Sequence, residues 1–242
     1  MSRLFSMVIL LLSLSAQLRA AAPSVPFVGC PADGQTGPVQ PPQSDNAAPT
    51  VPSEIQPKLS NYASTDLAVL APRGWHCFES YGSNGATLWV TPSAIGAQDL
   101  PGNRLVAPGP AIVISRIYGG TSGRFTVAKI VARVFPSSWS YARGVIAEKI
   151  EPERDFVFQP FPADILIRRG PNLVEFTTPA DDEGLGTFHA LATSRMPVTG
   201  VAILSPEDDM NLVMLDVRLP PELQSLASTI VGSVEQDAAA KP

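Results

Sequence analysis

The two cysteines of this chain, Cys30 and Cys77, constrain its fold more than any other pair of residues. A disulfide between them would tie the N-terminal region to the middle of the chain, and closing such a loop stabilises a fold by about 4 kcal/mol at most. Pairing requires an oxidising compartment. The competing interpretation, a free reactive thiol, requires a reducing compartment and a nearby base. The compartment therefore decides between the two.

The first residues have the layout of a cleaved secretory signal. Arg3 supplies a positive charge, and the segment Met7–Ser15 is short and mostly apolar. Small residues then follow between Ala16 and Ala22, where a signal peptidase would cut. The apolar run stops by Arg19 and is shorter than the roughly 20 residues that span a bilayer.

Two alternatives use the same segment differently. It could be retained as an N-terminal anchor, but its length argues against this. Cys30 could carry a lipid, as in a lipoprotein, but it lies too far beyond the apolar run. We therefore expect a signal peptide over residues 1–20, a mature chain without a membrane span, and an exported protein that is periplasmic or secreted. In that compartment the expected pairing is Cys30–Cys77.

The charge balance limits the partners of this chain. Its net charge is -5, with 17 basic and 22 acidic residues. Removal of residues 1–20 takes away Arg3 and Arg19 and no acid, which leaves 15 basic residues against 22 acidic ones, a net charge of -7. Such a chain is not attracted to nucleic acid or to an anionic membrane surface. At 45% hydrophobic and 16% charged residues, the composition is that of a globular protein.

The composition changes once along the mature chain. Residues 23–57 hold nine prolines, which favour an extended, semi-rigid segment with little apolar surface. From Leu59 onward, short apolar runs alternate with turn residues. We therefore expect a proline-rich leader over residues 21–58 and a single globular domain over residues 59–242.

The segment around Cys77 predicts a β-hairpin. Asn84-Gly85 is a strong turn signal between two runs that are rich in aromatic and β-branched residues. A turn centred on Asn84-Gly85 places Tyr81 opposite Leu88 and Glu79 opposite Val90. One face then carries His76, Phe78 and Trp89, and the other carries Trp75, Cys77, Leu88 and Val90.

The remaining patterns predict more strands and two or three helices. Residues 111–118 read as a strand, the pairs 163–169 with 172–178 and 200–204 with 211–219 as two further hairpins. Apolar residues at helical spacing predict a helix over 124–135 that Pro136 stops, and a weaker one over 138–150. A last helix follows Pro220 and Pro221, with one apolar face made of Leu223, Leu226, Ala227, Ile230, Val231 and Val234. The expected fold class is α+β: a mainly antiparallel sheet of about six to seven strands with two or three packed helices.

The segment "YGGTSGR" is the best candidate for a binding site. It lies between a predicted strand and a predicted helix start, where backbone N–H groups and the helix dipole favour an anion. The candidate binding residues are Gly119, Gly120, Thr121, Ser122, Gly123 and Arg124. The segment lacks the lysine and the spacing of a P-loop, and it also fits a tight turn in which Thr121 or Ser122 caps the helix.

A catalytic or metal-binding histidine could only be His76 or His189, because these are the two histidines of the chain. His76 lies among bulky aromatic residues, where a packed imidazole is the usual outcome. His189 follows the acidic run 181–183, which reads as a solvated turn. None of the known metal-binding spacings is present, so we expect no metal and no cofactor.

The segments "APRGWHCFESYGSNG", "YGGTSGRF", "EGLGT" and "VRLPPEL" resemble parts of exported bacterial proteins of uncharacterised function. The resemblance spans most of the mature chain. It implies an exported protein of a Gram-negative type with a single globular domain. It implies no catalytic residue.

Two functional hypotheses remain from the sequence. The first is a non-enzymatic exported protein that binds a small ligand or an envelope component. The second is a periplasmic hydrolase that uses Ser122 or Thr121 as its nucleophile. The hydrolase requires His76 or His189 within hydrogen-bond reach of the hydroxyl, whereas a binding site requires only backbone N–H groups and Arg124.

Overall fold

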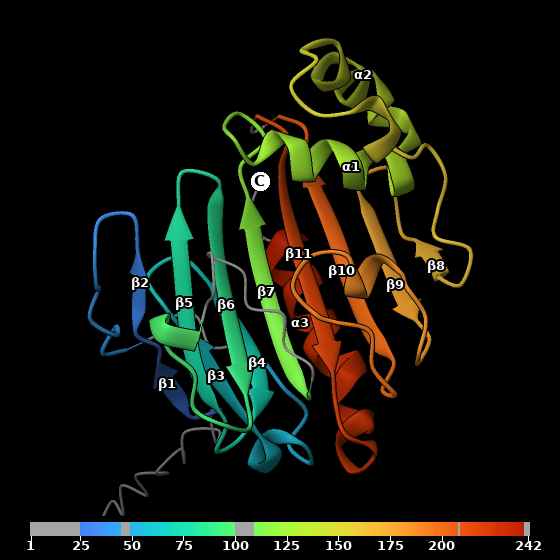
Figure 1. Cartoon of the computed structure of the whole chain (residues 1–242). Helices are drawn as coiled ribbons and strands as arrows, with labels where there is room; N and C mark the ends of the chain where they lie inside the picture. The colour runs from blue at the N-terminus through green and yellow to red at the C-terminus, as the bar shows by residue number, and fades with distance from the viewer. Residues whose placement is uncertain (1–24, 45–48, 100–108, 208, 240–242) are drawn as a thin grey trace, which may run out of the picture.

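The computed structural model describes residues 25–44, 49–99, 109–207 and 209–239 (Figure 1). The predicted signal peptide lies outside these residues. In chain order the strands and α-helices are β1 (Phe27–Gly29), β2 (Ala32–Gly34), β3 (Leu59–Ala63), β4 (Ala68–Pro72), β5 (His76–Gly82), β6 (Gly85–Thr91), β7 (Ala111–Ile117), α1 (Arg124–Val134), α2 (Trp139–Ala147), β8 (Ile165–Arg168), β9 (Leu173–Thr178), β10 (Val198–Ser205), β11 (Asn211–Arg218) and α3 (Ala227–Ala239).

Eight strands form one mixed sheet in the order β2-β5-β6-β7-β11-β10-β9-β8. Its neighbours run antiparallel except β2, which runs parallel to β5. A second, small sheet has the order β1-β3-β4. The predicted α+β class is confirmed, but the sheet is larger than predicted. The seven predicted strands are β5 to β11, and β2 adds an eighth from the proline-rich segment.

The large sheet is covered differently on its two faces. One face, here called the α1 face, packs against the apolar side chains of α1, among them Val127, Ile130 and Val131. The opposite face, the α3 face, packs against both the small sheet and α3. In Figure 1, α1 lies across the β7 to β9 half of the sheet, whereas no α-helix of the described residues lies in front of β2, β5 and β6. Among the described residues, the β2, β5 and β6 part of the α1 face therefore carries no α-helix.

The helices form where the sequence predicts them, with differences in the length of α2 and in the first turn of the C-terminal helix. α1 ends at Val134, directly before Phe135 and Pro136, as the proline predicts. α2 spans Trp139–Ala147 and is shorter than the predicted 138–150. The C-terminal helix begins as a 3-10 helix over Pro221–Leu226 and becomes α-helical only from Ala227.

The proline-rich region contributes two strands to the folded body. β1 runs parallel to β3, and β2 runs parallel to β5. Between β1 and β2 lies Cys30, which is 1% exposed and forms the predicted disulfide with Cys77. Their Cα atoms lie 5.4 Å apart. The disulfide prediction is confirmed, and the bond ties this region to the first residues of β5.

The β5–β6 hairpin forms as predicted, but the predicted register is wrong by two residues. Tyr81 lies opposite Ala86 and Glu79 opposite Leu88, so the two-residue turn is Ser83-Asn84. Gly85 belongs to β6, at φ 138°, and a Cβ there would lie 2.0 Å from the carbonyl oxygen of Arg116. This glycine is thus needed for the close approach of β7 rather than for the turn itself. A shift of two residues keeps every side chain on its predicted face.

Candidate functional site

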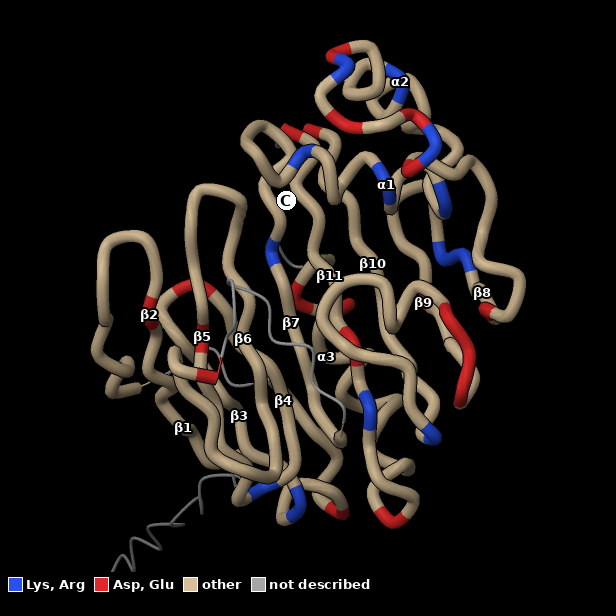
Figure 2. Tube along the Cα trace, in the orientation of Figure 1, with Lys and Arg blue, Asp and Glu red and all other residues tan. Residues whose placement is uncertain are grey.

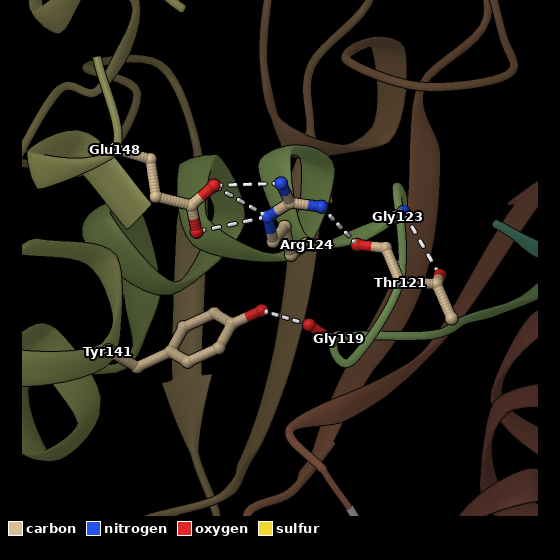
Figure 3. A network of polar contacts seen from close by, with 6 residues as sticks. All are labelled: Gly119, Thr121, Gly123, Arg124, Tyr141 and Glu148. Carbon is tan, nitrogen blue, oxygen red and sulfur yellow. Dashed lines mark hydrogen bonds and ion pairs between the residues drawn. The ribbon is translucent and has the colours of Figure 1, made fainter. Parts of the chain in front are cut away.

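The glycine-rich loop connects β7 to α1 and is held by its own hydrogen bonds (Figure 3). The hydroxyl of Thr121 donates to the carbonyl oxygen of Tyr118 at 3.0 Å and accepts from the N–H of Gly123 at 3.2 Å. The N–H of Thr121 also donates to Tyr118, at 3.4 Å, and that of Arg124 donates to Thr121, at 3.1 Å. Thr121 therefore stabilises the turn that starts α1.

Arg124 is committed to an ion pair with Glu148, which follows α2. Its Nε and Nη2 donate to the Glu148 carboxylate at distances between 2.7 and 3.0 Å. Its Nη1 donates to the carbonyl oxygen of Thr121 at 3.0 Å. The hydrogen bond between them raises the pKa of Arg124 and lowers the pKa of Glu148. The charge that was predicted to bind an anion is thus already matched by a carboxylate.

The start of the loop is packed against the β10–β11 turn. The N–H of Gly119 donates to Oδ1 of Asn211 at 3.1 Å, and its carbonyl oxygen accepts from the hydroxyl of Tyr141 at 2.9 Å. Burial raises the pKa of Tyr141 to about 12. Gly120 and Ser122 are the exposed members of the loop. An anion at this loop stays a prediction that would depend on these two residues.

The two histidines lie in different places. His76 is exposed at the first position of β5, opposite Thr91. At about 3.3 Å per residue, the length of β5 separates His76 from the hairpin turn by about 20 Å. The glycine-rich loop lies beside that turn. His189 instead lines a cavity at the hairpin end of the sheet. The hydrolase hypothesis therefore retains only His189 as a possible base.

The cavity has a volume of about 690 Å³ and lies over the β2, β5 and β6 part of the α1 face. It is referred to below as the hairpin cavity. Its lining comes from β2 and the residue after it, the β5–β6 hairpin, the 3-10 helix Ala97–Asp99, β7, α1 and the loop before β10. The lining residues are Asp33, Gly34, Gln35, Ser80, Tyr81, Gly82, Ser83, Asn84, Gly85, Ala86, Thr87, Trp89, Ala97, Arg116, Ile117, Thr126, His189 and Ala190.

A row of polar side chains crosses the floor of this cavity. Asp33 pairs with Ser80, Ser80 pairs with Thr87, and Thr87 pairs with Ser115 across four neighbouring strands. Residues paired in this way point to the same face of a sheet. The hydroxyl of Thr87 is hydrogen-bonded to that of Ser115 at 3.0 Å, and Ser115 is buried. The first three members of the row line the cavity.

The hairpin cavity adjoins the predicted site without containing it. Gly123 packs against the hairpin turn: a Cβ there would lie 2.6 Å from the carbonyl oxygen of Asn84. Thr126, one turn into α1, forms part of the cavity wall. None of the six predicted binding residues is among those that line the cavity. The sequence analysis therefore identified the loop beside the cavity and not the residues that line the cavity.

Comparisons of the chain with protein-family models, with curated proteins and with solved structures find no match. Within the described residues, no helix is long and apolar enough to cross a membrane. The same part of the chain holds no group of three or more His, Cys, Asp or Glu side chains arranged to hold a metal ion. The geometry of the cavity is therefore the basis for a functional proposal.

Proposed function

We propose that this protein is exported and binds a small polar ligand in the hairpin cavity, without catalysing a reaction. The observation that carries the proposal is the cavity itself, with its polar floor of Asp33, Ser80 and Thr87. Its volume of about 690 Å³ falls within the range of small-molecule sites.

Export is supported by the disulfide and by the N-terminal sequence. The Cys30–Cys77 bond is consistent with an oxidising compartment. Residues 1–20 have the charge, apolar run and small residues of a signal peptide. Together they favour a periplasmic or secreted protein whose ligand is a small molecule or a component of the cell envelope.

A lining residue on α1 allows the site to be tested without disturbing the sheet. Thr126 is half-buried on α1 and makes no hydrogen bond through its side chain within the described residues. Thr126→Trp adds a large side chain that should partly fill the cavity. Arg124→Gln removes the charge of the glycine-rich loop and leaves the cavity lining unchanged.

The experiment is a thermal-shift screen of the purified mature protein against small polar molecules, followed by titration calorimetry of any that stabilise it. We expect Thr126→Trp to abolish the thermal shift, because a ligand stabilises only the folded protein that binds it. We expect Arg124→Gln to leave binding unchanged. Binding that survives Thr126→Trp and is lost in Arg124→Gln would overturn the proposal and place the ligand in the glycine-rich loop.

A further inference from the structure

The floor of the hairpin cavity has a regular spacing. Asp33, Ser80 and Thr87 lie on three neighbouring strands, and neighbouring strands lie about 4.8 Å apart. The three side chains therefore extend over about 10 Å, roughly the length of a disaccharide. The cavity floor thus carries its polar groups in a single row that runs across the strands.

These three side chains use only part of their hydrogen-bonding capacity within the described chain. The hydroxyl of Ser80 makes no hydrogen bond to the rest of the described chain, and it can both donate and accept. One carboxylate oxygen of Asp33 accepts from the N–H of Gly34 at 2.8 Å, which leaves the other oxygen for a ligand. Thr87 bonds to Ser115 through its hydroxyl, which keeps further acceptor capacity.

The charge around the cavity is low. Figure 2 shows no charged residue at the tip of the β5–β6 hairpin, and residues 80–90 contain none. Arg116 lines the cavity, but the alternation of β7 directs its side chain to the α3 face, where its charge acts on Glu79. Asp33 is then the floor's one formal charge among the described residues. Sites for phosphate or carboxylate ligands instead gather arginine side chains.

The floor also has an aromatic border. Trp89 follows Thr87 on the same face of β6 and lines the cavity, and its indole Nε1 is buried with no acceptor among the described residues. His189 also lines the cavity. Because Trp89 is only 3% exposed, the hydroxyl groups and the one carboxylate of the floor carry the argument: they suit a ligand that offers many hydroxyl groups but no net charge.

From these observations we infer that the ligand of the hairpin cavity is a neutral polyhydroxylated molecule of the saccharide class. This inference rests on the proposed function. Ser80 and Thr87 exchange hydrogen bonds with ligand hydroxyls, and Asp33 accepts from a ligand hydroxyl. Charged ligands are disfavoured, since the floor offers no cation to an anion and only a single carboxylate to a cation.

The test is titration calorimetry of the mature protein with neutral trisaccharides (maltotriose, cellotriose and N,N′,N″-triacetylchitotriose), with inorganic phosphate and citrate as anions and spermidine as a cation. Tryptophan fluorescence gives a second readout, because Trp89 lines the cavity. We expect at least one trisaccharide to bind at millimolar concentration or below and to lose binding in Thr126→Trp. The anions and the cation should not bind.

Two substitutions of the floor test the arrangement. Ser80→Ala should weaken trisaccharide binding by about fivefold, and Asp33→Asn by about tenfold, because hydrogen bonds to a charged acceptor are the stronger ones. Thr177→Val is the matched control, since Thr177 is a half-buried β9 hydroxyl on the α3 face. It should leave binding unchanged.

The outcomes separate this inference from the proposed function. If phosphate, citrate or spermidine binds and is lost in Thr126→Trp while no trisaccharide binds, the saccharide inference is overturned and the binding function stands. If a trisaccharide binds equally well to Ser80→Ala and Asp33→Asn, the inferred floor contacts are wrong. If no trisaccharide binds at all, the saccharide inference is overturned whatever else the thermal-shift screen finds.

Discussion

The carboxylate of Glu79 on β5 is hydrogen-bonded to the hydroxyl of Ser64, which lies in the turn between β3 and β4. The bond joins the large sheet to the small one in the interior, where both side chains are buried. Oε1 of Glu79 has no partner among the described residues. Burial raises the pKa of Glu79 to about 7, opposed by the Ser64 hydrogen bond and reinforced by the negative charge of Asp66.

The raised pKa of Glu79 makes stability fall as the pH rises. Below pH 4.5 the carboxyl is protonated in both the folded and the unfolded chain. Between pH 4.5 and about 7 the folded protein keeps a proton that the unfolded chain has lost, so the free energy of unfolding decreases. The total decrease from this one group is about 3 kcal/mol, since a tenfold change in proton affinity is worth about 1.4 kcal/mol.

Glu79→Gln should remove this part of the pH dependence. The amide keeps a hydrogen bond to Ser64 and carries no charge, so the variant should be the more stable protein at pH 8. The measurement is urea denaturation of both proteins between pH 4 and pH 8. Glu54→Gln, an exposed carboxylate, serves as the control and should run parallel to the parent. A Glu79→Gln curve parallel to that of the parent would contradict the assignment.

The disulfide should contribute a large share of the stability of the N-terminal region. Removing it frees a loop with a sequence separation of 47 residues, which costs up to about 4 kcal/mol through the greater entropy of the unfolded chain. The double variant Cys30→Ala, Cys77→Ala leaves no unpaired thiol. Its free energy of unfolding should match that of the parent protein under reducing conditions. Two free thiols in the denatured, unreduced exported protein would show that the bond does not form.

Cleavage of the signal peptide should occur within residues 16–22. The small side chains there follow the apolar run at the position where signal peptidase cuts. N-terminal sequencing of the protein recovered from the periplasm or the medium measures the cleavage site directly. Exported material that begins at Met1 would support the retained anchor instead.

Most strands with local partners were predicted from the sequence, but β3 and β4, which pair locally as an antiparallel hairpin, were not. β5 to β11 combine alternating or continuous apolar runs with turn residues between neighbours, so period and turn identify them. β1 and β2 have three residues each and lie among prolines, too short to show any period. Their partners, β3 and β5, follow them only after long intervening segments. Nothing local in the sequence indicates such pairings.

The candidate site was missed for a related reason. The polar row exists only because Asp33, Ser80 and Thr87 come into register from three strands. The predicted hairpin register would have placed Ser80 opposite Trp89. Because alternation fixes the face of a strand but not its register, the row could not be found without the turn geometry. The glycine-rich loop was visible because all of its residues are contiguous.

Gly85 should tolerate no side chain, because it combines two constraints. Its φ of 138° is unfavourable for any L side chain, and a Cβ would lie 2.0 Å from the backbone oxygen of Arg116 on β7. Backbone atoms inside a sheet cannot move aside without breaking the β6–β7 ladder. Gly85→Ala should therefore lower the free energy of unfolding by about 3 kcal/mol or more.

Gly74→Ala separates the two constraints. Gly74 also has a positive φ, 86°, but a Cβ there meets nothing within 4 Å. This variant should lose only the backbone term, about 1 kcal/mol. Urea denaturation of the two variants at one pH compares them directly. Equal losses of stability in both would mean that β7 does not approach Gly85 closely, and the register that forms the cavity floor would have to be revised with it.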